Sequence, residues 1–597
     1  MSDKTLWQIA DVLRGSLPVW DGESLSELIL KLMLWRKLIR DGAIQENDTF
    51  LESFVESADK TISTLANKGM DTTLLKQAFE HDKWLKNLDA HKLDAAVRLI
   101  SDLDKVGKLK SIDPINLILL HQNGKRDGLW LPLELSTLMV DLAEISENDN
   151  VYVCWDDAGA LSQACAEKTK NISLETPRRS AMPALVSLLI DSKFKISFSD
   201  PIRNPSYLEE GGLVKFDKSI ADIPFGQKYD KDITDTDFLD RFPEKTTSSN
   251  ILGLRHLIAQ TNGRIVLMVS LNMLFSSGAE KTLREDILKQ GILETVISMP
   301  GGSLLNTQIP YAILILDSNG GHDTVKFINA DVDRFKKKSY ARVELVNMDE
   351  LREIALTQKS NDFSETVSVN EILENDAQLT VTRYVLPEED KKLLEIISSS
   401  ETTNLESLVA LIGPPRSLKK DQISNSIDVK ELGPSDMPLF GYVKTPGKVI
   451  ETDKDVAYKS FLKPLDIVLV SKGSVGKVGI VPEDFTATGH AWAPGQSTNI
   501  LRVRDVNIID PRALFMLLRS QIGQGLLKTL ATGATIPLIK LSDLRKLKVP
   551  LPSQEDSNAA IKAFNKECEI QKTIDGLKKE QKLISSNIWG FELEEKE

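Results

Sequence analysis

A recurring pattern of short apolar runs between residues 151 and 316 constrains the fold more than any other feature of this chain. The first four runs recur every 20–25 residues, with helical stretches between the earlier ones, and three more follow. The runs lie at 151–154, 171–174, 195–198, 216–221, 264–269, 293–298 and 311–316. Strands and helices that alternate at this spacing are typical of an α/β fold with a doubly wound, Rossmann-like sheet. We therefore expect ligands to bind at the carboxyl ends of these strands.

The tetrapeptide Asp222-Ile223-Pro224-Phe225 stands where the fourth run ends. An acidic residue, an apolar residue, a proline and an aromatic ring suit methylation of the exocyclic amine of adenine or cytosine. The Asp222 side chain and a backbone carbonyl held rigid by Pro224 can accept both N–H bonds and so localise the nitrogen lone pair. Phe225 can stack on a base that is flipped out of the duplex. For a motif this short, an ordinary strand end followed by a turn proline is the alternative.

The remaining chain divides by composition and periodicity. Residues 1–120 have helical spacing, 386–400 are charged and serine-rich, and 405–552 alternate short β-like runs with Gly/Pro turns. Apolar residues at spacings of three and four over 553–588 predict an amphipathic helix with a narrow seam. We therefore predict a helical N-terminal domain (1–120), a methyltransferase-like α/β domain (121–390), a linker (391–404), an α+β domain (405–552) and a long helix with a tail (553–597).

Composition limits the class of protein. The hydrophobic fraction is 41% and the charged fraction 27%, no apolar run is as long as a membrane span, and the three cysteines are scattered. We expect a cytoplasmic protein with no membrane association, disulfide framework or metal site. The net charge is −13, but residues 401–552 carry 20 Lys and Arg against 15 Asp and Glu. This basic segment is either a phosphate-binding footprint or a chance excess.

A methyl donor such as S-adenosylmethionine would lie over the first two strand ends. The turn 155–160 contains one glycine, Gly159, which lets the backbone approach a ligand closely. Glu175 ends the second run and could hold the ribose hydroxyls, and Asp200 follows the third and could accept a hydrogen bond from the adenine amine of the cofactor. Acidic residues at such positions can equally be solvated helix N-caps.

Two groups of short segments match those of known proteins, and they follow the same order along most of the chain. The first group includes Leu6-Trp7, Trp130-Leu131-Pro132, Gly263-Arg264, Leu274-Phe275, Met299-Pro300 and Thr307-Gln308-Ile309-Pro310. The second includes Leu465-Asp466-Ile467, Lys472-Gly473-Ser474-Val475-Gly476-Lys477, Gln496, Gly533-Ala534-Thr535-Ile536-Pro537 and Val549-Pro550-Leu551-Pro552. With these segments the chain resembles the modification (M) subunit of type I restriction–modification systems fused to half of a specificity (S) subunit, with one target-recognition domain.

The resemblance implies a sequence-specific DNA adenine N6-methyltransferase that uses S-adenosylmethionine and needs no metal. The base would be held by Asp222, Ile223, Pro224 and Phe225, and the cofactor by Pro132, Asp156, Gly159, Glu175 and Asp200. Double-stranded DNA would contact Lys472, Lys477, Arg502, Arg504 and Lys540, although solvated surface charge is the alternative for each. The implied assembly is a homodimer through the C-terminal helix, with a separate restriction subunit carrying helicase and nuclease activities.

The chain departs from the family at the cofactor loop. Val153-Cys154 replaces the usual Asp-Pro, Asp157 stands where the first glycine falls, and Leu131 replaces a Thr or Ser. Asp156 and Asp157 also place two carboxylates beside the expected position of the cofactor's own carboxylate. These departures favour an alternative, in which the chain is a catalytically inactive, methylase-like DNA-recognition subunit of a defence complex. The tetrapeptide, Glu175 and Asp200 favour the enzyme.

Overall fold

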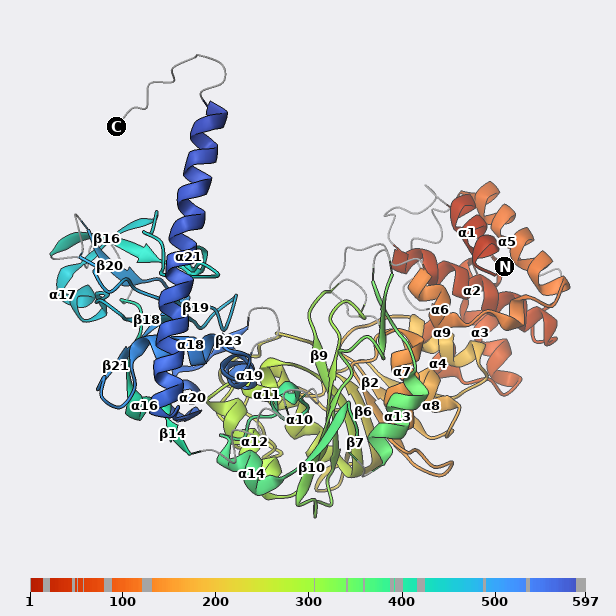
Figure 1. Cartoon of the computed structure of the whole chain (residues 1–597). Coiled ribbons are helices and arrows are strands. Elements are labelled where there is room, and N and C mark those ends of the chain that lie inside the picture. Colours follow the sequence, from red (N-terminus) through yellow and green to blue (C-terminus); the bar gives the residue numbers. More distant parts are fainter. Residues whose placement is uncertain are drawn as a thin grey trace. The chain divides into compact units, whose positions relative to one another are not determined.

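The computed structural model describes residues 2–13, 22–45, 49–50, 52–56, 58–79, 89–120, 131–304, 307–339, 342–357, 360–386, 391, 401–415, 425–486, 490–532 and 537–586. Trp130 and Gly533–Ile536 of the matching segments lie outside these ranges. The chain forms two compact units, Met1–Val385 and Leu386–Glu597, whose elements are labelled in Figure 1. Each unit has hydrophobic cores of its own.

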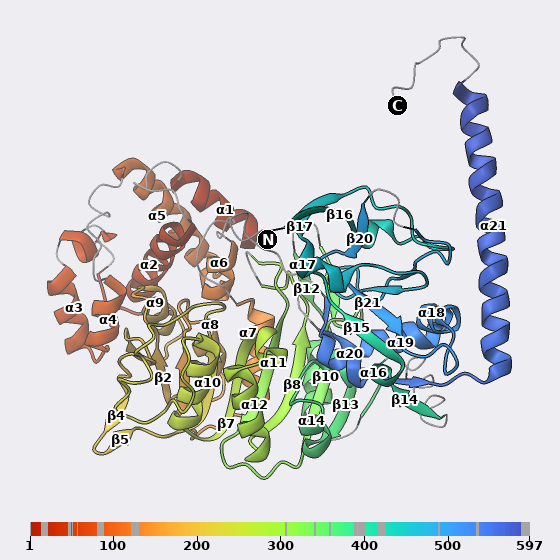
Figure 2. The same ribbon diagram turned by 90° about the vertical axis from the view of Figure 1, so that its left-hand side faces the viewer.

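A nine-stranded sheet organises the first unit. Its strand order is β13-β10-β8-β9-β7-β6-β1-β2-β3, and only β9 and β13 run antiparallel to their neighbours. Figure 2 shows β2, β7, β8, β10 and β13 following one another across this sheet. The strands are β1 (Val151–Cys154), β2 (Ile172–Glu175), β3 (Lys195–Ser197), β6 (Phe216–Asp222), β7 (Thr261–Ser270), β8 (Leu293–Met299), β9 (Tyr311–Asp317), β10 (Thr324–Asn329) and β13 (Ser364–Ser368). The predicted α/β architecture with a large, mostly parallel sheet is confirmed.

Helices cover both faces of the sheet because its strands are apolar on both sides. Along β1, Val153 packs into one core and Tyr152 into the other, as alternation in a strand requires. The first core includes α7 (Leu133–Leu142), α8 (Ala160–Ala166), α9 (Met182–Leu189) and α13 (Met348–Leu356). The second includes α10 (Ser249–Gln260), α11 (Asn272–Phe275), α12 (Ala279–Lys289) and α14 (Val369–Glu374). Smaller elements are β4 (Leu208–Glu209), β5 (Gly212–Leu213), β11 (Lys336–Lys338), β12 (Val343–Leu345) and η4 (Val381–Arg383).

The N-terminal region is helical and shares the first core with the sheet. Its elements are α1 (Ser2–Leu13), α2 (Gly22–Arg40), η1 (Glu52–Glu56), α3 (Ala58–Asn67), α4 (Thr72–Phe79), α5 (Ala90–Lys105), η3 (Leu109–Ser111) and α6 (Pro114–Leu120). Both α2 and α4 pack against α9. Because this core is continuous, residues 1–120 fall in the same compact unit as the sheet.

The second unit is built from small sheets and short helices. The larger sheets have the orders β15-β21-β18-β19 and β17-β16-β20, and β14 pairs antiparallel with β24. Residues 402–404, which the sequence assigns to the linker, form β14. The strands are β14 (Thr402–Asn404), β15 (Val409–Ile412), β16 (Ser426–Leu432), β17 (Val449–Asp453), β18 (Ile467–Val470), β19 (Val478–Ile480), β20 (Ala491–Pro494), β21 (Thr498–Val503), β22 (Ala531–Thr532), β23 (Leu538–Ile539) and β24 (Lys548–Pro550). The helices are α16 (Leu405–Leu408), η6 (Pro434–Asp436), α17 (Lys454–Ala457), η7 (Tyr458–Ser460), α18 (Pro511–Arg519), α19 (Gln521–Leu530) and α20 (Leu541–Lys546).

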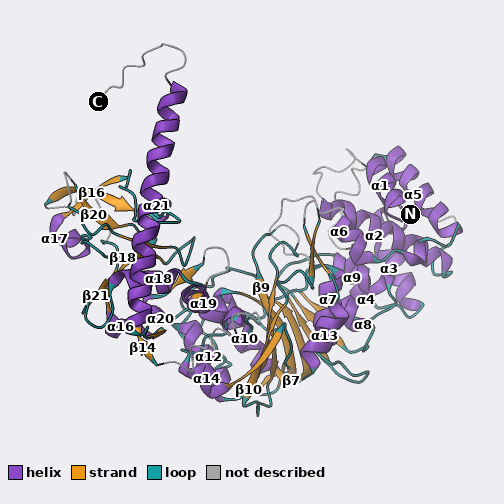
Figure 3. Cartoon of the chain, viewed as in Figure 1, coloured by secondary structure: helices purple, strands orange, loops and turns teal. Residues whose placement is uncertain are grey.

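A single long helix, α21 (Gln554–Ser586), follows these sheets (Figure 3). Its first half packs on α18, where the Phe564 ring is buried against Phe515. The second half leaves large apolar side chains exposed, among them Ile570, Ile574, Leu577 and Ile584. Their spacings of four, three and seven residues place them along one seam of the helix.

Two features are missing from the described ranges. None of the helices there is both long and apolar enough to cross a bilayer. The same ranges contain no cluster of three or more His, Cys, Asp or Glu side chains suited to a metal ion. The three cysteines are free thiols, and Cys154 and Cys165 are buried.

Candidate functional site

Asp222 is the last residue of β6 and lies at the carboxyl edge of the sheet. Its side chain is buried, and its Oδ1 atom has no hydrogen-bond partner among the described residues. Burial, and then repulsion from Asp157 and Asp156, raise the pKa of the Asp222 carboxyl well above its usual range. A buried acceptor without a donor is costly in free energy. The Asp222 Oδ1 atom is therefore a buried polar atom without a partner at the carboxyl edge of the sheet, among the described residues.

The other residues of the tetrapeptide are fixed by neighbouring elements. The Ile223 side chain is fully buried beside Gly253 of α10, and the Pro224 carbonyl accepts a hydrogen bond from the Ser249 hydroxyl at 2.9 Å. Phe225 is half-buried, and its ring centroid lies 6.3 Å from that of Tyr311, the first residue of β9. The tetrapeptide thus combines a rigid backbone with a partly exposed aromatic ring next to Asp222.

The first carboxylate of the loop after β1 is hydrogen-bonded within the protein. Asp156 is buried and accepts hydrogen bonds from the Ser162 backbone N–H and hydroxyl, both at 2.8 Å, so it caps the start of α8. Gly159 has a φ of +84°, and a Cβ atom there would lie 3.2 Å from the Pro183 Cα atom. Only glycine suits this conformation and close approach. The loop is therefore compact and tied to α8 and α9.

Glu175, the last residue of β2, is fully buried. Its Oε2 atom accepts a hydrogen bond from the Tyr152 hydroxyl at 2.5 Å, and its Oε1 atom accepts one from the Ser206 N–H at 2.6 Å. Burial raises the pKa of the Glu175 carboxyl, although both hydrogen bonds oppose that rise. Both carboxylate oxygens are thus occupied by groups of the protein itself.

The hydrogen bonds continue from Glu175 through the interior. The Tyr152 hydroxyl lies 3.0 Å from His256 Nε2, and His256 Nδ1 lies 2.9 Å from Arg241 Nη1. The five N–H groups of Arg241 bond to His256, to Asp237 twice and to the carbonyls of Pro201 and Ile202. Burial and the Arg241 charge lower the pKa of His256 well below its usual range. We call Glu175, Tyr152, His256, Arg241 and Asp237 the buried polar network.

The other candidate positions at this edge have ordinary local roles. Asp157 accepts a hydrogen bond from the Thr176 hydroxyl, and its side chain is 31% exposed. Asp200 accepts hydrogen bonds from the Ile202 N–H at 2.9 Å and from the Tyr229 hydroxyl at 3.2 Å. Pro132 is buried immediately before α7. The Asp200 contacts resemble the turn or capping role that the sequence left open as an alternative.

The five candidate DNA-contacting cations fall into different environments. Lys472 and Lys477 are exposed on the turn between β18 and β19 and form no ion pair within the described ranges. Arg502 pairs with the buried Asp466 carboxylate through Nε and Nη2, at 2.8 and 2.7 Å. Arg504 donates from Nε to two backbone carbonyls, and Lys540 is half-buried just before α20. Arg502 and Arg504 therefore have internal partners in this structure.

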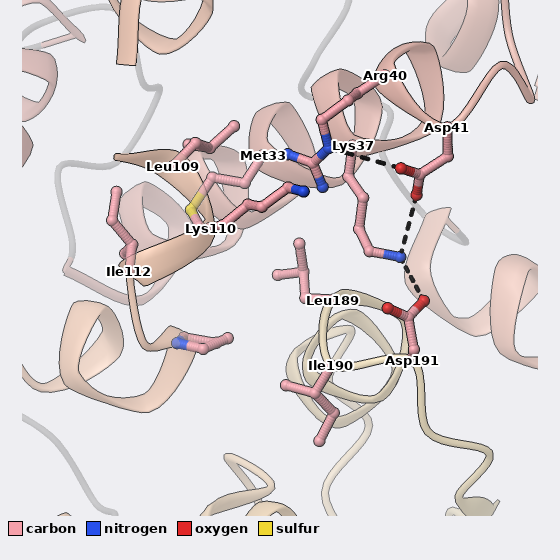
Figure 4. Close-up of a pocket in the computed structure, with 11 residues that line it drawn as sticks. Met33, Lys37, Arg40, Asp41, Leu109, Lys110, Ile112, Leu189, Ile190 and Asp191 are labelled. Carbon is pink, nitrogen blue, oxygen red and sulfur yellow. Dashed lines mark hydrogen bonds and ion pairs between the residues drawn. The ribbon is translucent and has the colours of Figure 1, made fainter. Parts of the chain in front are cut away.

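A separate cavity of about 390 Å³ lies between α2, the segment 109–114 and the end of α9 (Figure 4). Lys37 bonds to Asp191 at 2.5 Å across it, and Arg40 and Asp41 complete a set of ion pairs. None of the candidate base, cofactor or DNA residues lines this cavity.

Two family models match the chain one after the other. Residues 120–392 match the N-6 DNA methylase family, and residues 398–582 match the type I restriction modification DNA specificity domain. The first segment is thus similar to N-6 DNA methylases, and the second is similar to type I DNA specificity domains.

Known methylase subunits resemble a large part of this chain. The type I restriction enzyme MjaVII methylase subunit of Methanocaldococcus jannaschii is 22% identical over a match of 401 residues, and the match covers 61% of this chain and 67% of that subunit. The MjaVIII methylase subunit of the same organism is 24% identical over 308 residues, 47% of this chain and 53% of that subunit. The crystal structure of a type I restriction-modification methyltransferase subunit from Streptococcus thermophilus has a TM-score of 0.50 at 18% identity, covering 64% of this chain and 99% of that one. This last likeness shows the fold alone.

The N-6 DNA methylase family implies S-adenosylmethionine as the methyl donor. In the present conformation, however, Glu175 and Asp156 do not fit that cofactor. Glu175 has no exposed surface and is held inside by hydrogen bonds to both carboxylate oxygens, and Asp156 is bonded to α8. The sequence departs from the cofactor-binding pattern of the family at the loop 153–159. The structure adds Glu175 as a second position that departs from it. Asp222 differs from these two carboxylates, because its Oδ1 atom has no hydrogen-bond partner among the described residues.

Sequence reasoning missed the buried polar network beyond Glu175. Tyr152 and His256 are 104 residues apart and meet only because α10 packs on the face of the sheet that Tyr152 occupies. The one available signal was composition, since the chain has six histidines and one of them stands in a segment rich in Leu and Ile.

Proposed function

We propose that the chain is a sequence-specific DNA adenine N6-methyltransferase of a type I-like restriction–modification or phage-defence system, with its own recognition domain. The observation that carries the proposal is the buried Asp222 Oδ1 atom, which has no hydrogen-bond donor among the described residues and lies beside the partly exposed Phe225 ring. The matching methylase and specificity families support it. The protein would act in the cytoplasm, where its DNA substrate lies.

In this proposal the target adenine leaves the duplex and stacks on Phe225. Its exocyclic amine donates a hydrogen bond to Asp222, and the Ile223 carbonyl is positioned by the rigid backbone before Pro224 to accept the second. Ser249 holds that backbone through the Pro224 carbonyl. Holding both N–H groups localises the nitrogen lone pair and orients it, which is the main contribution that positioning makes to such a reaction.

The specificity domain would read the DNA sequence and bind its backbone. Lys472 and Lys477 are the candidates for phosphate contacts because both are exposed and lack an ion pair among the described residues. The exposed seam of α21, formed by Ile570, Ile574, Leu577 and Ile584, would pair with the same helix of a second copy. Such a homodimer would read two half-sites, and a separate subunit would supply restriction.

Expression in a bacterial host that lacks adenine methylation would test the proposal. Sequencing of the host DNA should show N6-methyladenine at one recurring sequence with the natural protein. The Asp222→Ala variant should remove that signal, while Asp230→Ala, which removes an exposed acidic side chain from the loop after the tetrapeptide, should keep it. Unmodified DNA with the natural, folded protein would contradict the proposal.

The internal hydrogen bonds of the Glu175 and Asp156 carboxylates favour a second candidate function. With Glu175 and Asp156 bonded internally, the chain would be an inactive methylase-like subunit that recognises DNA for other components of a defence complex. That function requires tight, sequence-specific DNA binding together with no S-adenosylmethionine binding in calorimetry, with or without DNA. Cofactor binding at micromolar affinity would exclude it.

A further inference from the structure

The Tyr152 hydroxyl is held in one place by aromatic packing. Tyr152 is fully buried, stacks on Phe216 with ring centroids 4.9 Å apart, and meets the edge of Tyr207 at 5.7 Å. Its strand pairs directly with the strand that ends in Glu175, because β1 and β2 are parallel neighbours. The Tyr152 hydroxyl therefore cannot follow the Glu175 carboxylate if that side chain turns toward the edge of the sheet.

The proton of this hydroxyl is directed to Glu175. Arginine can only donate hydrogen bonds, so His256 Nδ1 accepts from Arg241 and His256 Nε2 carries the ring proton. That proton is donated to the Tyr152 oxygen, which leaves the single hydroxyl proton for Glu175 Oε2. The hydrogen bonds from Arg241 to His256, from His256 to Tyr152 and from Tyr152 to Glu175 thus all have the same donor-to-acceptor direction.

We propose that Tyr152 is a positioning residue that holds Glu175 inside the methylase and so weakens S-adenosylmethionine binding. The inference rests on the proposed methyltransferase function, in which Glu175 is the residue placed to bind the ribose. Because Glu175 is fully buried, it must turn outward to reach the ribose hydroxyls, and its Oε2 atom then leaves the fixed Tyr152 hydroxyl. Removing that hydroxyl removes the competition and leaves the carboxylate free to turn outward.

Calorimetry of S-adenosylmethionine binding to the full chain tests this inference. Tyr152→Phe should bind the cofactor about tenfold more tightly than the natural protein, a difference of about 1.4 kcal/mol. Tyr207→Phe is the matched control, because its hydroxyl bonds to the Leu174 and Lys195 carbonyls and not to Glu175. It should change the dissociation constant by less than about twofold, since an ordinary loss of one hydrogen bond does not release Glu175.

Two further variants make the result decisive. The double variant Tyr152→Phe with Glu175→Gln should lose the gain, because the amide cannot replace a carboxylate that accepts two ribose hydroxyls. If Tyr152→Phe does not fold, Ser206→Pro removes the other donor to Glu175 from an exposed turn and should also tighten binding. General structural damage weakens binding, so it cannot imitate this gain.

The outcomes separate this inference from the proposed function. Should the natural protein methylate DNA while neither Tyr152→Phe nor Ser206→Pro binds the cofactor more tightly, only the inference is overturned. If no variant binds S-adenosylmethionine, with or without DNA, both the inference and the methyltransferase function fail. A gain that persists in the Glu175→Gln double variant also overturns the inference.

Discussion

Arg519, at the end of α18, binds both carboxylate oxygens of Glu567 on α21 with its two terminal nitrogens. The Nη1–Oε1 distance is 2.7 Å, and the second contact joins Nη2 to Oε2. Glu567 Oε1 also accepts a hydrogen bond from the Gly441 N–H at 2.9 Å. Three points of contact on one carboxylate fix the packed half of α21 on the domain that contains α18.

Replacement of Glu567 by Gln should destabilise the second unit in a pH-dependent way. Burial raises the pKa of Glu567, but the bonds from Arg519 and Gly441 outweigh it and the net pKa is lowered. The stabilisation is therefore present above the ordinary value of 4.5 and is lost as pH falls through the lower value of the folded state. Denaturant unfolding should show a loss of about 1–3 kcal/mol at pH 7. An equal loss of stability at acidic and neutral pH would contradict a stabilising role of the ionised Glu567 carboxylate.

Gly253→Ala should disturb the tetrapeptide through Ile223. A Cβ atom at this position would lie 2.7 Å from Ile223 Cδ1 and 3.3 Å from the Trp155 ring, so Ile223 must shift. We expect a stability loss of about 1–3 kcal/mol and weaker methylation, measured on the same preparation. Gly576→Ala in α21 is the control, because nothing among the described residues lies within 4 Å of its new methyl group. That helix-favouring change should instead stabilise the protein by up to about 1 kcal/mol.

Asp222→Asn should make the protein more stable at neutral pH. The folded state raises the pKa of Asp222. The resulting loss of folding stability is absent below the ordinary value of 3.8 and grows as pH rises toward the folded-state value. The amide that replaces the carboxyl carries no charge, and unfolding at pH 7 should show a gain of about 1–3 kcal/mol that shrinks in acid. A gain that stays constant with pH would show that Asp222 is not a strained carboxyl.

Arg241→Met should cost far more stability than the same change at Arg203. The side chains of Arg241 and Asp237 are each 2% exposed, and the substitution leaves the Asp237 carboxylate charged and buried without its partner. Unfolding experiments should show a loss of about 3–5 kcal/mol. Arg203 is 44% exposed and pairs with Asp230 at 2.8 Å on the surface, so its loss should be less than about 1 kcal/mol. Similar losses at both positions would contradict the role of the buried polar network.

The double variant Lys472→Gln with Lys477→Gln should weaken DNA binding equally for all sequences. Each lost phosphate contact should reduce the slope of log K against log salt by about 1, measured by fluorescence anisotropy. Arg502→Gln should mainly lower stability, because it leaves the Asp466 carboxylate buried without a partner. If the lysine variant keeps the salt slope of the natural protein, neither side chain binds phosphate.

Periodicity located seven of the nine strands of the large sheet, all but β10 and β13, and it did not locate the contacts of the site. Every predicted apolar run falls on a strand, because strands buried on both faces leave an unmistakable apolar pattern in the sequence. The order of the strands depends on long-range pairing, as does the antiparallel β9 that brings Tyr311 beside Phe225. The direction in which each side chain points could not be predicted from the sequence either. Glu175 is at the expected strand end, yet its carboxylate points inward because Tyr152 and Ser206 offer donors there.

The pairing of β14 with β24 brings the entrance and the exit of residues 405–547 side by side. A segment whose two ends meet in this way can be exchanged for another without moving the chain before or after it. Replacement of this segment alone would then give the same methylase a new DNA sequence to recognise. Under the proposed function, recombination at two short strands would change the DNA target of this chain, with no change in the remainder of the protein.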